Sequence, residues 1–233
     1  MKSIDSSALC MSLPGMPSNL ETAPKVELHL HLEGAIPLRT MWHLITKYGG
    51  DPVVPTFDAL VDHLQYSDFP HFIETWWWMT GFVRSYEDFE HVAESVATDL
   101  ARQQIVYAEA SFSPTDFERH GMTAQEMALA IRRGLDRVEG TQVVLNCDLV
   151  RDTGPDRAGR TLEAVIEVAD AADVRGITIG GSEHAYPPEL FTNVYRRAGD
   201  AGLRLTAHAG EAAGPESVRA ALDALGVERI GHG

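Results

Sequence analysis

The chain has 233 residues, of which 44% are hydrophobic and 23% are charged, so it is long enough to bury a sizeable core. Its formal net charge of −15 repels phosphate backbones, which disfavours nucleic acid as a partner. No apolar run approaches the roughly 20 residues of a membrane span. The two cysteines, Cys10 and Cys147, form neither a disulfide framework nor a CxxC metal pattern. These features favour a cytoplasmic protein with no membrane partner.

The first stretch of the chain, residues 1–22, is rich in serine and proline and shows no hydrophobic periodicity. It also lacks an apolar segment long enough for a signal peptide. We therefore expect residues 1–22 to form a flexible tail and residues 23–233 to form one domain.

Six short apolar runs alternate with longer helical patterns along this domain. The predicted strands cover residues 25–31, 104–112, 142–150, 174–180, 203–207 and 229–231. The predicted helices cover residues 37–48, 86–103, 124–138, 155–172, 187–201 and 215–225. Repeated alternation of strand and helix predicts parallel strands joined by right-handed crossovers.

An open doubly wound sheet and a (β/α)₈ TIM barrel both satisfy this alternation. The candidate chemical residues lie at the C-terminal ends of several different strands: His29 and His31, Gly180 and Gly181, His208, and His232. That distribution is typical of a barrel, and the GITIGG run lacks the spacing of a dinucleotide fingerprint. Because we count five full strands and a short sixth, we expect an α/β TIM barrel that is truncated after about the sixth strand.

A helical insertion is expected at about residues 50–85, after the first strand–helix unit. Within it, Phe72, Ile73 and Trp76 fall on one face of a helix. Two interpretations of this face stay open. It packs into the core, as such a pattern usually does, or it forms an apolar wall over the mouth of a pocket.

Two histidines stand out in the first predicted strand. His29 and His31 are two residues apart, so both imidazoles point to the same face of the sheet. His208 ends a later strand and supplies a third imidazole, a set that suits Zn²⁺ or another divalent first-row metal. Glu211 follows three residues later, where a carboxyl group can move protons between water and substrate. His232 ends the last predicted strand.

Five motifs now carry a family resemblance: PKVELHLHLEGAI, VYAEASFSP, GITIGGSE, LTAHAGE and RIGHG. In this order, between Pro24 and Gly233, they resemble the successive motifs of the adenosine deaminase family within the metal-dependent amidohydrolase superfamily. The HxH pair alone would indicate only the superfamily, whereas HxH-L-[DE]-G followed by HAGE and GHG resembles the adenosine and adenine deaminase group.

The resemblance implies a role for each of the residues already singled out. It assigns His29, His31 and His208 to a zinc site with one ion per chain. It implies that Glu211 protonates N1 of a purine ring while an activated water attacks C6. It also implies that His232 orients that water and helps to deprotonate it.

The resemblance further implies the contacts of a purine substrate. Gly181 matches the glycine whose backbone contacts the purine, and Phe72, Ile73 and Trp76 match the apolar lid over the base. Glu33 stands where nucleoside-specific members usually carry an aspartate that contacts the 5′-hydroxyl of the sugar.

The resulting prediction is metal-dependent hydrolytic deamination of a 6-aminopurine nucleoside, adenosine to inosine and ammonia. Glu33, Thr178 and Ser182 differ from the residues usual in the family, so adenine and modified adenosines are kept as alternative substrates. The partner is in each case a small purine molecule.

A further interpretation is a catalytically inactive fragment that acts only through association. The family carries another metal ligand, an aspartate after the eighth strand, in an Asp-Asp-Pro-like motif that this sequence does not contain. We therefore expect little deaminase activity from these 233 residues alone. The unclosed edges of such a barrel would favour self-association.

Overall fold

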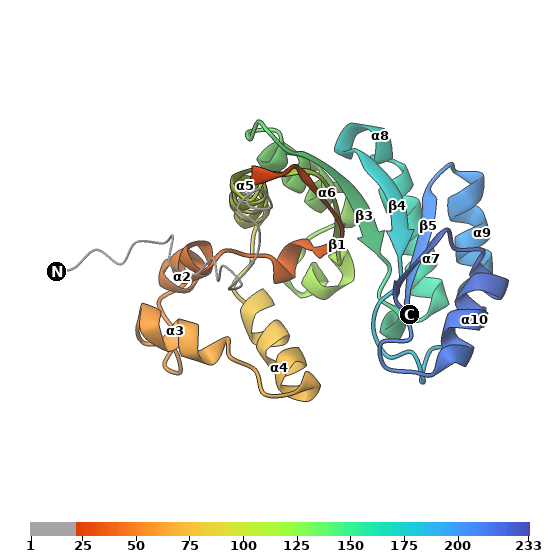
Figure 1. Ribbon diagram of the computed structural model, residues 1–233, viewed down its shortest axis with the longest axis horizontal. Coiled ribbons are helices and arrows are strands. Elements are labelled where there is room, and N and C mark those ends of the chain that lie inside the picture. The colour runs from red at the N-terminus through yellow and green to blue at the C-terminus, as the bar shows by residue number, and fades with distance from the viewer. Residues whose placement is uncertain (1–21) are drawn as a thin grey trace.

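Six parallel strands form one curved sheet in the computed structural model, which describes residues 22–233 (Figure 1). The strands lie in chain order: β1 (Lys25–His31), β2 (Ile105–Phe112), β3 (Gln142–Asp148), β4 (Val174–Thr178), β5 (Arg204–Ala209) and β6 (Arg229–His232). All six predicted strands are confirmed. The expected tail lies outside the described residues, apart from its last one.

Helices follow most strands and cover the convex face of the sheet (Figure 1). They are α2 (Leu38–Lys47), α5 (Tyr86–Arg102), α6 (Ala124–Leu135), α7 (Pro155–Ile166), α8 (Ala169–Ala172), α9 (Thr192–Asp200) and α10 (Pro215–Leu225). The prediction of a single helix over residues 155–172 is wrong, because the structure has two helices there, α7 and α8. The helical segment is interrupted at Val168, whose backbone leaves the helical region at φ −120° and ψ 5°.

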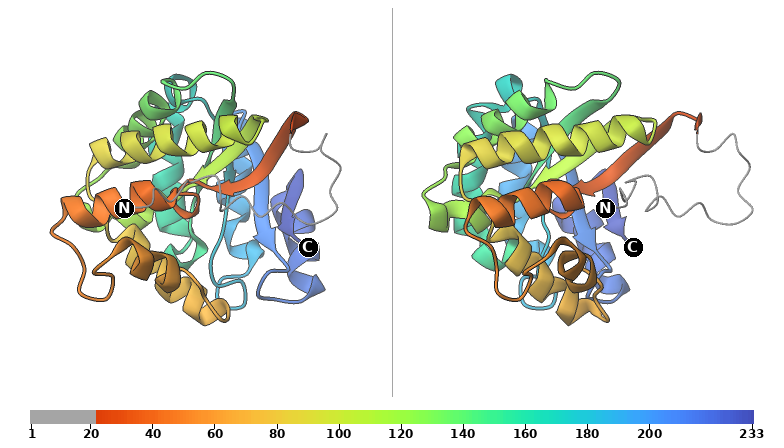
Figure 2. Two further views of the ribbon diagram at one scale, coloured as in Figure 1. Left: turned by 60° about the vertical axis from the view of Figure 1, so that its left-hand side comes forward. Right: turned by 90° about the vertical axis from the view of Figure 1, so that its left-hand side faces the viewer.

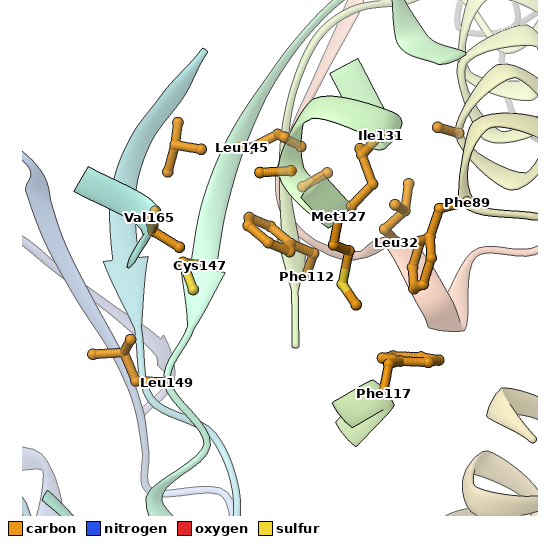
Figure 3. Close-up of a cluster of buried hydrophobic side chains, with 14 of the residues drawn as sticks. Leu32, Phe89, Phe112, Phe117, Met127, Ile131, Leu145, Cys147, Leu149 and Val165 are labelled. Carbon is orange, nitrogen blue, oxygen red and sulfur yellow. The ribbon is translucent and has the colours of Figure 1, made fainter. Parts of the chain in front are cut away.

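The side chains of each strand alternate between the helices and the concave face of the sheet. In β2, Ala110 and Phe112 are fully buried on the helical side, whereas Glu109 points to the concave side. Figure 3 shows the core that results, with Phe112 between β3 and the side chains of Met127 and Ile131 on α6. The core therefore lies between sheet and helices, and the concave face is left for polar groups.

The sheet curls toward a closed barrel. Arg229 of β6 forms an ion pair with Glu109 of β2, although these strands are not neighbours in the sheet. At the two edge strands, the rings of His29 and His232 lie 4.9 Å apart. The concave face is thus narrow enough for side chains from β1 and β6 to meet, as in the predicted barrel.

Two strands end earlier than predicted, at Asp148 and Thr178. The Asp148 carboxylate accepts hydrogen bonds from the backbone N–H groups of Val150 and Gly180, both at 2.9 Å. These side-chain contacts lie just beyond both strand ends, where backbone N–H groups of Leu149 and Arg151 still donate to the carbonyl oxygens of Thr178 and Gly180.

The insertion between α2 and α5 contains two helices, α3 (Phe57–His63) and α4 (Phe69–Thr80). They lie together with α2 on the β1 side of the sheet (Figure 1). Asp68 begins α4, since its side chain accepts a hydrogen bond from the His71 N–H at 2.9 Å. Within residues 22–233, no helix is both long and apolar enough to cross a membrane.

The insertion is followed by α5, which runs beside α2 (Figure 2). Asp88 at the start of α5 is 1% exposed and joins the two helices. Its carboxylate accepts hydrogen bonds from Lys47 Nζ and the Tyr48 hydroxyl, both at 2.5 Å, and from the N–H groups of Arg84 and Ser85. One buried carboxylate therefore holds the C-terminus of α2 against the N-terminus of α5.

Replacement of this carboxylate should destabilise the fold. We expect Asp88→Ala to lower the free energy of unfolding by roughly 2–3 kcal/mol, because the cap and several partners of a buried charge are lost together. Asp99→Ala is the matched control on the same helix, since Asp99 is 38% exposed and should cost less than about 0.5 kcal/mol. Urea unfolding followed by circular dichroism measures both, and equal losses would contradict this account.

Candidate metal centre and active site

Four imidazoles meet at the C-terminal ends of β1, β5 and β6. His31 Nε2 lies 2.9 Å from His208 Nε2. The ring of His29 lies 4.7 Å from that of His208 and 4.9 Å from that of His232. The i, i+2 spacing on β1 places His29 and His31 on one face of the strand, as the sequence predicts.

The donor set of this cluster fits a divalent metal ion. His29, His208 and His232 offer one nitrogen each, all within 4.8 Å of one another. Nitrogens that share a tetrahedral zinc ion lie roughly 3.3 Å apart, close to the 2.9 Å between the His31 and His208 nitrogens. This three-nitrogen set contains His232 in place of the predicted ligand His31, which joins the cluster through His208, 2.9 Å away between their Nε2 atoms.

Burial keeps the central imidazoles neutral, which is the form that binds metals. Burial lowers the pKa of His208 to about 3. It also lowers the pKa of His29, with the charges of His31 and His232 as further causes. Thr178 Oγ1 lies 3.2 Å from His208 Nδ1, so the hydroxyl can fix the ring and leave Nε2 directed at His31.

Glu211 lies beside this cluster on the loop that follows β5. Its Oε2 atom is 3.5 Å from His232 Nε2, and both side chains are partly exposed, at 27% and 37%. His232 has a φ of 76°, a left-handed backbone conformation that costs a residue other than glycine about 1 kcal/mol or more. A carboxyl group and an imidazole thus face each other next to the candidate metal ligands.

Gly181 lies on the turn after β4, and only glycine fits there. Its φ is 106°, and a Cβ at this position would lie 1.9 Å from Asp152 Oδ2. Asp152 in turn accepts hydrogen bonds from Ser182, from the N–H at 2.8 Å and from the hydroxyl at 2.5 Å. The predicted purine-contacting glycine is exposed at the rim, beside an acidic side chain.

Glu33 lies in the short 3₁₀ turn Leu32–Gly34 after β1 and is fully buried. Its Oε1 atom accepts a hydrogen bond from the Ser113 N–H at 2.9 Å, and Oε2 has no partner among the described residues. Burial raises the pKa of Glu33 to about 8, so the carboxyl group is largely protonated at pH 7. Glu33 is therefore a neutral, fully buried carboxyl group, one oxygen of which has no partner among the described residues.

The predicted lid residues differ in their positions on α4. The Trp76 ring stands edge-on to His31 at 5.9 Å, and the Phe72 ring lies 6.2 Å from Trp76. Ile73 is 36% exposed. Trp76 therefore borders the histidine cluster, Phe72 extends the same apolar wall, and Ile73 points toward solvent.

Sequence analysis missed three polar residues near this rim. Asp116 follows β2, and burial together with the charge of Asp148 raises its pKa to about 7. Arg151 and Glu183, which follow β3 and β4, are 0% and 2% exposed. All three follow a predicted strand, and their sequence position could have indicated them, because the active-site residues of TIM barrels lie at the C-terminal ends of the strands.

Comparison with known proteins agrees with this geometry. The family model described as adenosine deaminase matches residues 24–233. An aminodeoxyfutalosine deaminase from Streptomyces avermitilis is 34% identical over 216 residues, which covers 90% of this chain and 60% of the relative. An adenine deaminase from Rhodospirillum rubrum is 30% identical over 220 residues, covering 93% of this chain and 65% of the relative. The chain thus spans less than two thirds of the length of these curated relatives.

Among solved structures, an amidohydrolase from Burkholderia ambifaria with bound zinc is similar to this chain. It superposes with a TM-score of 0.81 at 29% sequence identity, over 91% of this chain and 59% of that one. The similar fold supports the TIM-barrel prediction and a divalent metal in the amidohydrolase manner. By its sequence match over residues 24–233, the chain belongs to the adenosine deaminase family.

Proposed function

We propose that this protein is a metal-dependent deaminase of 6-aminopurine nucleosides, which converts adenosine and water to inosine and ammonia. The observation that carries the proposal is the convergence of His29, His31, His208 and His232 beside Glu211 on one rim of the barrel. Family membership and the activities named for the relatives support the same reaction type.

In this proposal, His29, His31 and His208 hold one zinc ion per chain. A zinc ion in such a site supplies a water molecule whose pKa is lowered from 15.7 toward ~7, so that a nucleophile is available at neutral pH. Another divalent first-row metal would serve in the same way.

The protein side chains then handle protons and orientation. The Glu211 carboxyl group donates a proton to N1 of the purine as water adds to C6, which neutralises the charge that builds up on the ring. His232, 3.5 Å from Glu211, orients the water, accepts its proton and passes it to the 6-amino group, which leaves as ammonia when the C6–N bond breaks. The Gly181 backbone contacts the purine, while Trp76 and Phe72 keep bulk water from the base.

The substrate is proposed as adenosine, with adenine or a modified adenosine as the alternative. Glu33 is one methylene longer than the aspartate it replaces, so it either crowds the 5′ group of a ribose or fills the space of an absent one. A contact with the substrate would give a partner to its Oε2 atom, which is buried and unpartnered among the described residues. The two relatives named as an adenine deaminase and an aminodeoxyfutalosine deaminase support adenine and a modified adenosine as alternative substrates.

A second candidate function is association without catalysis. β1 and β6 end the sheet, and Val26 and Leu28 on β1 are 61% and 40% exposed. Unpaired strand edges with apolar side chains favour pairing with another chain. Native mass measured together with aminopurine turnover distinguishes the two, since a purely associating protein forms oligomers and shows no turnover of any aminopurine.

Metal content tests the ligand set. The purified protein should hold about one divalent ion per chain, and His31→Ala should lose it because a nitrogen of the set is removed. His232→Ala should keep the ion while losing turnover. The exposed pair of His43 and His91, with rings 5.2 Å apart on α2 and α5, provides the control double variant His43→Ala, His91→Ala. Elemental analysis decides, and an His31→Ala protein that keeps its metal would refute this ligand set.

The role of Glu211 is tested by steady-state kinetics with zinc supplied. Glu211→Gln should lower kcat by roughly 10²-fold or more with little change in KM, because the carboxyl proton is needed only in the transition state. The control is Glu228→Gln, an exposed carboxylate paired with Arg204 at 3.0 Å, which should retain the kcat of the unaltered protein. An unchanged kcat in Glu211→Gln would remove this residue from the mechanism.

Substrate choice is tested by comparing kcat/KM for adenosine, adenine and 5′-modified adenosines. We expect adenosine to lead, and Glu33→Asp to raise its kcat/KM relative to that of adenine by about 10-fold, since one methylene in a pocket is worth about that factor. A preference for adenine that Glu33→Asp leaves unchanged would favour the alternative. Activity on cytosine compounds alone would overturn the assignment.

A further inference from the structure

Glu183 is a buried carboxylate that holds the loop after β5. Its Oε1 atom accepts hydrogen bonds from the N–H groups of Glu211 and Ala212, both at 2.9 Å. Its Oε2 atom accepts from the Gly210 N–H at 2.9 Å and from the Ser217 hydroxyl at 2.5 Å. One side chain from the loop after β4 therefore binds three successive backbone N–H groups around Glu211.

These three N–H groups have no backbone acceptor within residues 22–233. Successive N–H groups that converge in this way form an anion-binding nest, and here a side-chain carboxylate fills it. A charged acceptor with two oxygens can bind all three donors, whereas a single amide oxygen cannot. The conformation of the loop thus depends on the carboxylate of Glu183.

The preceding end of the same segment is held by Arg151, which is fully buried. Its guanidinium donates to the carbonyl oxygen of His208 at 2.7 Å and to that of Tyr186 at 2.9 Å. Burial lowers the pKa of Arg151, and the nearby charge of Glu183 opposes that shift. The segment from His208 to Ala212 is therefore held by a buried cation at one end and a buried anion at the other.

We infer that Glu183 is a positioning residue, which sets the loop at Gly210–Ala212 so that the Glu211 carboxyl group faces His232 and the substrate. The inference rests on the proposed function, in which Glu211 is the proton donor. It gives Glu183 a role that differs from packing, because three of its four hydrogen bonds go to the loop and only one goes to α10.

The test compares Glu183→Gln with Ser217→Ala. The glutamine places an N–H₂ group opposite at least one backbone N–H of the nest, so we expect the exchange protection of the Gly210, Glu211 and Ala212 amides to fall by about 10-fold. We expect kcat to fall by roughly 10- to 10²-fold at unchanged KM, since misplacing a reacting group by about 1 Å can cost ~10²-fold. Ser217→Ala removes only the contact to α10 and should keep both readouts near those of the unaltered protein.

Three outcomes overturn the inference. The first is a folded Glu183→Gln protein with unchanged kcat and amide protection. The second is the same loss in Ser217→Ala, which would indicate a merely structural contact. The third is a loss of protection spread over β5 and α10 with KM changed as much as kcat.

Two further measurements keep the test decisive. Should Glu183→Gln fail to fold, Glu183→Asp replaces it, because the shorter carboxylate keeps the charge but withdraws it from the nest. Should these 233 residues alone deaminate no aminopurine, the amide-exchange comparison still decides whether Glu183 holds the loop.

Discussion

The whole site depends on the parallel arrangement of the strands. In a sheet whose strands all run the same way and lie in chain order, every C-terminal end falls on the same rim. Side chains two residues apart then share a face, so His29 and His31 both point inward. The curvature of the sheet brings the ring of His232 on the last strand to 4.9 Å from the ring of His29 on the first strand. Residues separated by most of the chain thus become neighbours.

The rim shows how local donors decide the charge of a carboxyl group. Glu33 and Glu183 are both nearly fully buried, and burial alone raises the pKa of a carboxyl group. Glu33 accepts one hydrogen bond from a neighbouring loop, and its pKa rises to about 8. Glu183 accepts four hydrogen bonds, which outweigh burial and lower its pKa. The first is therefore largely neutral at pH 7, whereas the second holds a loop as an anion.

Much of the fold and part of the site could be predicted because they follow from local pattern. Short apolar runs that alternate with helical patterns mark all six strands, and the i, i+2 spacing of His29 and His31 predicts their shared face. The strand ends could not be read this way, since hydrogen bonds such as that from the Gly180 N–H to Asp148, 32 residues apart in the chain, lie there. Arg151 and Glu183 were missed for the same reason. Helical periodicity also placed Ile73 and Trp76 on one face of α4. In the structure, Trp76 packs against His31 at the rim, whereas Ile73 is exposed.

The glycine of RIGHG illustrates how closely the two edges of the sheet approach each other. A Cβ at Gly231 would lie 2.3 Å from Cε1 and 2.6 Å from Nδ1 of His29. Any side chain there would have to displace an imidazole that is already held between His208 and His232. Gly231 is therefore required by the space that His29 occupies, and its own backbone needs no left-handed conformation. Because a glycine directly precedes His232 in the last motif, His232 on β6 and His29 on β1 can occupy neighbouring positions. The two strands can therefore contribute to one cluster.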